Sequence, residues 1–314
     1  MNGMIIYNPM AGRFPSRLLV EQAAKVLESK GWQITIQRTH GSKDIQTLTG
    51  KAVEENLDAV FIAGGDGSIN QSVARLLGSD TALGVLPAGT ANVWAQEIGL
   101  PILTWTQWSA LEKSAKLLAE GRIRTVDVGL CMGTPFLLWA GVGLDAFVVN
   151  HIEPRTRWEK NFAIPQYAAN AAWFARKWKG MELKIIVEDE VIEGTYVLAV
   201  VTNVRLYAGG MAEISPGARI NDGHMDLWLF SGKTLAETLE HMWMVYSGQH
   251  FDSKKVRQLS CREVEFQSES SLYLQVDGEP LPETDTARIT MRPSALRVMT
   301  PSELPHPLFA EDTS

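Results

Sequence analysis

DAVFIAGGDGSINQSV, residues 58–73, places a short apolar run directly before three glycines, one carboxylate and an amphipathic segment. The apolar run is typical of a buried strand, and the segment after it is typical of a helix. Glycine allows close backbone approach and positive φ values at such a turn. The first amides of a helix lack intrahelical partners and lie at the positive end of the helix dipole. The stretch therefore predicts a strand–turn–helix unit that binds phosphate at the turn.

The first third of the chain alternates between strand and helix patterns. Strands are expected at 4–8, 33–39, 58–63 and 82–87, and helices at 16–29, 42–56 and 69–77. Such alternation predicts a doubly wound α/β domain, with a parallel sheet covered on both faces. Ligands of such sheets bind beyond the carboxyl ends of the strands. Three polar, glycine-bearing loops fall there: NPMAG (8–12), GGDGS (64–68) and PAGTAN (87–92).

After a helix expected at 109–119, strand patterns dominate. Strands are expected at 136–140, 183–188, 191–202, 225–230, 256–267, 272–276 and 287–291, and helices at 158–178 and 234–246. Many strands with few crossover helices predict an antiparallel, β-rich second domain, similar to a β-sandwich. We place the domains at 1–124 and 125–295. The Pro-rich tail, about 296–314, is expected to return to the first domain.

The composition narrows the class of protein. The 314 residues carry a formal net charge of −7, with 45% hydrophobic and 21% charged residues, which is the balance of a soluble globular protein. A general nucleic-acid binder would show a basic surplus, so nucleic acid is not expected as a partner. Cys131 and Cys261 are far apart and form no CxxC pair, which fits a reducing compartment. The start shows no basic leader, and no apolar stretch reaches the roughly 18 residues of a membrane span. We therefore expect a cytoplasmic protein.

Asp66 lies inside the glycine-rich turn, where it would repel a bare phosphate. A Mg²⁺ ion or a hydroxyl group is therefore expected between them, which makes Asp66 a candidate catalytic residue. The turn is neither a Walker A loop nor a GxGxxG fingerprint. A tight turn with an Asp N-cap is the alternative, but PAGTAN repeats the arrangement after the next strand.

GGDGSIN (64–70) followed by LPAGTAN (86–92) resembles the diacylglycerol kinase catalytic-domain family. That family includes sphingosine and ceramide kinases and is distantly related to NAD kinases. IYNPMAG (6–12), RINDGHMDLWLF (219–230) and LYLQVDGEP (272–280) resemble further motifs of the family in the same order. The resemblance implies an ATP-dependent, Mg²⁺-dependent lipid kinase with its active site in the cleft between two domains.

The same resemblance implies where the nucleotide and a metal ion bind. The residues implied to border ATP are Asn8, Pro9, Gly12, Thr39, Gly64, Gly65, Asp66, Gly67, Ser68, Ile69, Asn70, Gln71 and Thr90. Helix or turn capping would explain Thr39 and Thr90 equally well. A second-domain Mg²⁺ site is implied at Asp222 with the backbone of Arg219 and His224, and Asp127 is implied to contact metal-bound water. An ordinary Asn-Asp-Gly hairpin turn explains that loop equally well.

The stretch 272–277 alternates apolar and polar residues, so Gln275 and Asp277 face away from its apolar side. Gly278 then turns the chain and leaves Asp277 and Glu279 side by side. One of two adjacent carboxylates can accept a proton from a hydroxyl while the other orients metal or water. The resemblance favours Glu279 as the general base, with Asp277 as the next candidate. A solvated acidic hairpin turn is the alternative.

Two features bear on the acceptor. Many family members carry Asp directly after GTxN, where this chain has Val93, so diacylglycerol is one acceptor among others, such as phosphatidylglycerol. Segment 155–179 carries six basic residues against one acid, with aromatic residues interleaved. That pattern is typical of surfaces that approach anionic head groups, here at the inner membrane face. A core helix with a basic rim and the lining of an acyl channel are the alternatives.

Two other functions stay open beside the lipid kinase. The NAD kinase family shares GGDG but resembles this chain less over NPMAG and GTAN. A catalytically idle nucleotide- or lipid-binding sensor is disfavoured by the intact Asp66, Asp277 and Glu279 and favoured by Val93. The sequence also leaves an oligomer open.

Overall fold

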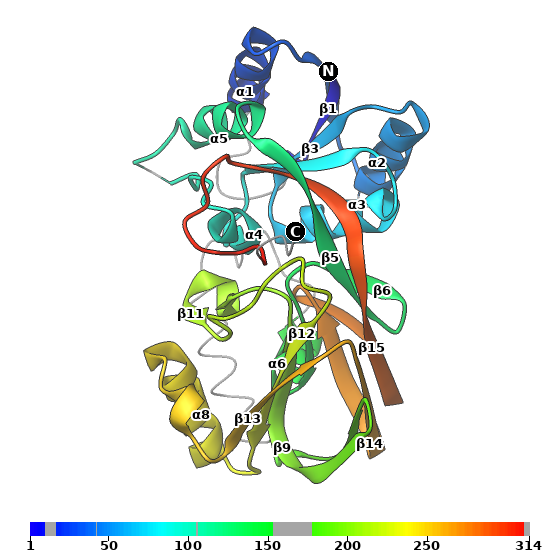
Figure 1. Ribbon diagram of the computed structural model, residues 1–314, viewed down its shortest axis with the longest axis vertical. Coiled ribbons are helices and arrows are strands. Elements are labelled where there is room, and N and C mark those ends of the chain that lie inside the picture. The colour runs from blue at the N-terminus through cyan, green and yellow to red at the C-terminus, as the bar shows by residue number, and fades with distance from the viewer. Residues whose placement is uncertain (10–16, 42, 105, 153–177, 311–314) are drawn as a thin grey trace. The chain divides into compact units, whose positions relative to one another are not determined.

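The structure, a computed structural model, describes residues 1–9, 17–41, 43–104, 106–152 and 178–310 (Figure 1). It divides into two compact units. Unit 1 comprises Met1–Asp127 and Ser294–Ser314, and unit 2 comprises Val128–Pro293. The chain therefore leaves unit 1 within strand β5 (Arg122–Cys131) and re-enters it within β15 (Glu279–Thr300).

Unit 1 is built on a parallel sheet. Its strands are β1 (Asn2–Tyr7), β2 (Gln33–Arg38), β3 (Ala59–Gly64) and β4 (Ala82–Pro87), in the order β2-β1-β3-β4. The last part of β15 extends the sheet, with Val298 parallel to Leu83 of β4. Every residue of β3 and β4 is buried, as central strands covered on both faces require. The strand order reverses at β1, which makes the end of β1 a topological switch point.

Helices cover both faces of this sheet. They are α1 (Arg17–Ser29), α2 (Asp44–Glu54), α3 (Asp66–Leu76), α5 (Ala110–Ala119) and the short α4 (Val93–Glu97). Helix α1 packs with α5 and α2 packs with α3. Figure 1 shows the two pairs on opposite sides of the strands. The doubly wound α/β architecture predicted from the alternating patterns is thereby confirmed.

Unit 2 is an antiparallel β structure. Its main strands are β7 (Trp139–Gly143), β8 (Met181–Val187), β9 (Glu190–Thr202), β12 (Met225–Ser231), β13 (Val256–Cys261), β14 (Glu263–Val276) and the first part of β15. The order is β13-β12-β9-β7-β14-β15. Strands β7 and β8 occupy successive stretches between the long strands β9 and β14. The predicted β-rich second domain is confirmed.

Small elements complete the described part of unit 2. They are β6 (Thr134–Phe136), β10 (Leu206–Tyr207), β11 (Ala212–Glu213), the 3-10 turns Ala208–Gly210 and His250–Asp252, and the helices α6 (Leu144–Ile152) and α8 (Leu235–Ser247). Helix α6 begins directly after Gly143, whose φ is +107°. Helix α6 was not predicted, because its residues continue the apolar run of β7. The helix expected at 158–178 lies outside the described residues except for its last one.

Two further features of the described residues concern helix apolarity and the cysteines. None of the helices in the described ranges combines the length and apolarity needed to cross a bilayer. Cys131 and Cys261 are free thiols within the core of unit 2, and burial raises the pKa of each to about 12. Thiols with so high a pKa are poor nucleophiles and metal ligands, so we regard both as core residues.

Helix α8 begins with a capping box. The Thr234 hydroxyl accepts the N–H of Glu237 at 3.3 Å, and the Glu237 carboxylate accepts the N–H of Thr234 at 3.1 Å. Two amides that the helix itself cannot satisfy thereby gain partners. We expect Thr234→Ala to lower the free energy of unfolding by about 1 kcal/mol in urea denaturation. Ser247→Ala, an exposed hydroxyl at the other end of α8, is the control and should change it by less than about 0.5 kcal/mol. Equal losses would contradict a specific contribution from the cap.

Candidate functional site

Four chain segments leave the parallel sheet of unit 1 at one edge. Tyr7 pairs with Arg38 and with Ala63, and Gly64 pairs with Pro87, so the four strands end level with one another. The residues that follow are Asn8, Thr39, Gly65 and Ala88. Main-chain bonds tie them to the neighbouring strand, as in Thr39 N–H to Tyr7 O at 3.0 Å and Ala88 N–H to Gly64 O at 3.0 Å. The structure thus gathers the predicted loop residues at the switch point, while Gly12 lies outside the described residues.

The GGDGS and PAGTAN loops touch through two glycines. A Cβ atom on Gly89 would lie 2.3 Å from the Cα of Gly65, closer than non-bonded carbon atoms can approach. Asn92 keeps the second loop closed: its Oδ1 accepts the Gly89 N–H and its Nδ2 donates to the Gly89 carbonyl, each at 2.9 Å. Asn92 is fully buried and adopts φ +54°. Glycine is therefore required here for the contact between loops, beyond any need of a ligand.

Asp66 joins the same two loops. It is the first residue of α3, and its Oδ1 accepts the N–H of Trp94 at 3.3 Å. Burial raises the pKa of Asp66, and hydrogen bonds from the amides of Val93 and Trp94 oppose that rise. The carboxylate therefore lies at the N-terminus of α4, where the helix dipole favours negative charge. Sequence reasoning placed a Mg²⁺ ion or a hydroxyl beside Asp66 and did not include this contact.

The other predicted nucleotide-binding residues differ in exposure. Thr39, Ser68 and Ile69 are buried, and Ile69 lies on the face of α3 that packs into the unit. Thr90 is exposed. The half-buried residues among them are Asn8, Pro9, Gly65, Gly67, Asn70 and Gln71. Because the Ile69 side chain is in the core, only its main chain can take part in binding.

The predicted metal residues lie in two places. In unit 2, Asp222 Oδ1 accepts the N–H of His224, and Asp222 O lies 2.9 Å from His224 Nδ1. Arg219 directs its guanidinium to the carbonyls of residues 217 and 218. This loop offers one exposed carboxylate and main-chain carbonyls, a donor set that fits a hard cation keeping most of its water. Within the described ranges, no group of three or more His, Cys, Asp or Glu could hold a metal ion.

Asp127, the remaining predicted metal residue, lies in unit 1. Its side chain is fully buried, and its Oδ1 accepts the N–H of Ser294 at 2.7 Å. Asp127 is the last residue of unit 1 before the chain departs, and Ser294 is the first after it returns. The bond therefore joins β5 to β15 where the chain leaves unit 1 and where it re-enters it.

The β14–β15 hairpin carries the predicted carboxylate pair. Val276 pairs with Glu279 across a two-residue turn in which Asp277 has φ +48° and Gly278 has φ +83°. The Asp277 carboxylate accepts three main-chain N–H groups, from Leu137, Leu138 and Trp139, at 2.9, 2.9 and 3.0 Å. It is only 9% exposed, whereas Glu279 is exposed. These contacts make Asp277 an anchor of the turn and favour Glu279 as the carboxylate that meets a substrate.

A second buried carboxylate, Asp145 of α6, is bonded to β14 of this hairpin. Its Oδ2 accepts from Gln275 Nε2 and from the Tyr207 hydroxyl, both at 2.9 Å, and its Oδ1 accepts the Ala146 N–H at 2.6 Å. Burial raises the pKa of Asp145, and the bonds from Gln275 and Tyr207 oppose that rise. A Cβ atom on Gly141 would lie 2.2 Å from Asp145 Oδ2, so glycine there makes room for the carboxylate. Sequence reasoning missed Asp145, although a lone carboxylate ending the apolar run FLLWAGVGL was a usable signal.

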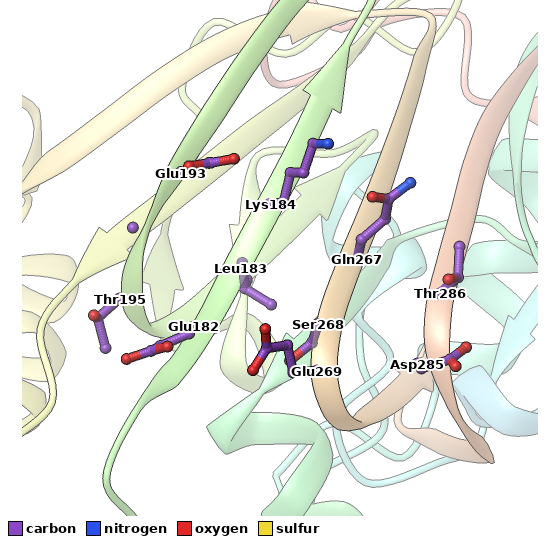
Figure 2. A pocket seen from close by; sticks show the side chains of 11 residues that line it. Glu182, Leu183, Lys184, Glu193, Thr195, Gln267, Ser268, Glu269, Asp285 and Thr286 are labelled. Atoms are coloured by element: carbon purple, nitrogen blue, oxygen red, sulfur yellow. The ribbon is translucent and has the colours of Figure 1, made fainter.

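A polar groove and an apolar pocket lie in the described part of unit 2. A polar groove of about 770 Å³ runs across β8, β9, β14 and β15 (Figure 2). Its side chains include Glu182, Lys184, Glu193 and Asp285. A pocket of about 460 Å³ is instead mostly apolar. Its apolar lining includes Leu144, Val148, Val197, Leu198, Ala212, Phe230 and the α8 residues Leu239, Met242, Trp243, Val245 and Tyr246, and its polar members are Asp145, Tyr207, Thr238 and His241. Its size and composition are those of a site for an apolar ligand with a polar end.

Only the end of the aromatic, basic segment 155–179 is described. The Trp178 indole donates to Val197 O at 3.1 Å and packs against the rings of Phe147 and Tyr273. Lys179 is exposed. Trp178 is therefore a packing residue of unit 2.

Two family descriptions match the chain. Residues 2–131 match the diacylglycerol kinase catalytic domain, and residues 139–300 match the YegS C-terminal NAD kinase beta sandwich-like domain. A diacylglycerol kinase of Mycobacterium tuberculosis is 27% identical over 303 residues, covering 94% of this chain and 93% of the relative. A diacylglycerol kinase of Bacillus subtilis is 26% identical over 277 residues, covering 88% of each.

Solved structures share the fold. A diacylglycerol kinase from Bacillus anthracis superposes with a TM-score of 0.71 at 18% identity, covering 95% of this chain and 96% of the other. Another structure from the same organism gives a TM-score of 0.77 at 19% identity, covering 95% and 97%. These likenesses extend over both units.

The glycine contact between the two loops predicts a measurable effect. We expect Gly89→Ala to lower the free energy of unfolding by about 1–3 kcal/mol, because its Cβ must push the Gly65 backbone away. Gly50→Ala, inside α2, is the matched control and should raise it by about 0.5–1 kcal/mol, since its Cβ would meet only the Arg75 side chain, at an ordinary contact distance of 3.9 Å. Urea denaturation of both variants measures the difference. An unchanged Gly89→Ala protein would contradict the tight contact.

Proposed function

The chain belongs to the diacylglycerol kinase catalytic-domain family and is a kinase with an alcohol group as acceptor, and we propose that it transfers the γ-phosphate of ATP to a hydroxyl of a lipid such as diacylglycerol. The observation that carries the lipid acceptor is the apolar pocket of unit 2, which has a carboxylate and a phenol at one wall. A water-soluble acceptor such as NAD has no acyl chain to place against that apolar lining.

Unit 1 would bind the nucleotide. The first amides of α3, ahead of the Ser68 and Ile69 N–H groups that bond to Gly65 O, suit its terminal phosphates because they lie at the positive end of the helix. Asn8, Pro9 and Thr39 follow the neighbouring strands and would border the nucleotide. Asp66 would hold the PAGTAN loop against these amides and fix their directions. A Mg²⁺ ion bound with ATP would neutralise phosphate charge.

Glu279 would take the proton from the lipid hydroxyl. Its carboxylate is exposed, and the turn before it is fixed by the three bonds to Asp277. A base on a fixed turn keeps its reach and direction, which general base catalysis needs. Asp277 would position the turn without meeting the substrate.

The apolar pocket would take the acyl part of the acceptor. Asp145 and Tyr207 stand at its wall and can exchange hydrogen bonds with a glycerol hydroxyl. The metal site at Asp222, the role of Asp127 at metal-bound water, the cleft between the domains and the domain boundaries stay predictions. The approach of 155–179 to a membrane, the cytoplasmic location and an oligomer also stay predictions.

Phosphate transfer from radiolabelled ATP to a total lipid extract tests the function. We expect the wild type to label a lipid and Glu279→Gln to lower kcat by about 10²–10⁴-fold with the KM for ATP unchanged, because an amide cannot accept the proton. Glu283→Gln, an exposed carboxylate on the same strand, is the control and should keep full activity. Label on NAD would instead identify an NAD kinase, and ATP binding without transfer would identify an idle binding protein.

The pocket predicts a dependence on chain length. We expect Ala212→Phe to raise the KM for long-chain diacylglycerols and to spare short-chain ones, because the ring would fill part of the pocket. Ala236→Phe, exposed on α8 and outside the pocket lining, is the matched control. Steady-state kinetics over a series of acyl lengths measures the effect. Equal KM changes for short and long chains would argue against acyl binding there.

A further inference from the structure

We propose that Gln275 is a positioning residue that couples the acceptor pocket to the turn carrying Glu279. The proposal rests on the proposed function, because only there does Glu279 act as the base. It adds that the contents of the pocket influence the base through one side chain.

The side-chain amide of Gln275 forms hydrogen bonds through both its nitrogen and its oxygen. Its Nε2 donates to Asp145 Oδ2 at 2.9 Å, and its Oε1 accepts the Gly278 N–H at 2.8 Å. The Asp145 carboxylate can only accept and the Gly278 N–H can only donate. The amide nitrogen of Gln275 must therefore face Asp145, and its oxygen must face Gly278. Gln275 is 2% exposed, so water does not compete for these bonds. It forms a bridge with a defined direction.

One end of the bridge faces the pocket. Asp145 lines the pocket and also accepts from Tyr207 on β10. The lining also holds two titratable groups of α8, the Tyr246 phenol and His241, whose Nε2 lies 2.8 Å from Ser231 O. A hydroxyl of a bound acceptor would add a donor at Asp145 or displace Tyr207. Either change alters the strength of the hydrogen bond from Gln275 Nε2 to Asp145 Oδ2.

The other end of the bridge holds the turn. Asp277 is fixed by the amides of residues 137–139, whereas Gly278 is held through Gln275. Without the Gln275 bond, the turn keeps its Asp277 anchor and the hairpin persists. Glu279, the next residue, keeps its pairing with Val276, but the residue before it is no longer held by a side chain. The expected consequence is a misdirected carboxylate within an intact fold.

Two variants separate coupling from simple support. Gln275→Leu removes both bonds and should lower kcat by about 10²-fold with the KM for ATP unchanged, because small misplacement of a catalytic group is costly. Gln275→Glu keeps the acceptor for Gly278 and places a second carboxylate beside Asp145. Two such carboxylates share one proton, which replaces the lost Nε2–H. The kcat of Gln275→Glu, relative to wild type, should therefore rise as pH falls.

Gln267→Leu is the matched control. Gln267 is a half-buried glutamine on the same strand, whose Nε2 donates to Glu265 Oε1 at 2.6 Å, away from the turn. It should keep the wild-type kcat and pH profile. Thermal unfolding checks that each variant is folded, and the nearly isosteric Gln275→Glu carries the test if Gln275→Leu does not fold.

A readout without catalysis separates this proposal from the proposed function. Dioctanoylglycerol added to the wild type should change hydrogen exchange of the peptide that contains Gly278, and Gln275→Leu should abolish that change while still binding the lipid. If Glu279→Gln kept full activity, the base assignment would fail and the exchange experiment would still decide the coupling. An unaltered exchange response in Gln275→Leu, or a Gln275→Glu pH profile parallel to wild type, would overturn it.

Discussion

Gly65 and Gly89 approach each other so closely that a Cβ atom on Gly89 would lie 2.3 Å from the Gly65 Cα, which leaves no room for a side chain at position 89. This contact brings the loop after β3 against the loop after β4. Asn92 then closes the second loop on itself, and Asp66 bonds across to the start of α4. The amides that we propose to meet the nucleotide's phosphates lie in these two loops, so the same contacts would fix their directions. Preorganised amides of this kind need little rearrangement on binding.

The same arrangement gives a physical account of Val93. Its side chain is 1% exposed, and its main-chain N–H serves the Asp66 carboxylate. A carboxylate at position 93 would bring a second negative charge toward a buried one, which is unfavourable without a cation. An apolar residue there packs into unit 1 while the main chain keeps its bond. The departure from Asp therefore leaves the loop contact intact.

Unit 2 uses two buried carboxylates for different purposes. Asp277 is satisfied by three main-chain donors, which offset the cost of burying its charge and fix the hairpin. Asp145 is satisfied by side chains as well, and it stands at the wall of the apolar pocket. A group bonded by side chains at a pocket wall can exchange partners when a ligand enters, whereas one bonded by three main-chain amides of a single segment cannot. This difference separates a fixed support from a responsive one.

The sequence by itself determined the parallel sheet, the loops at the ends of its strands, the alternation along 272–276 and the Asp-Gly turn after it. These features are local, because periodicity and glycine chemistry act over a few neighbouring residues. Only the tertiary structure decided what the carboxylates do. Asp66 meets an amide 28 residues away, Asp145 meets Gln275 across 130 residues, and Asp277 meets amides 138 to 140 residues away. Such partners are chosen by strand register and packing, and no local pattern encodes which distant donor will lie opposite a given carboxylate.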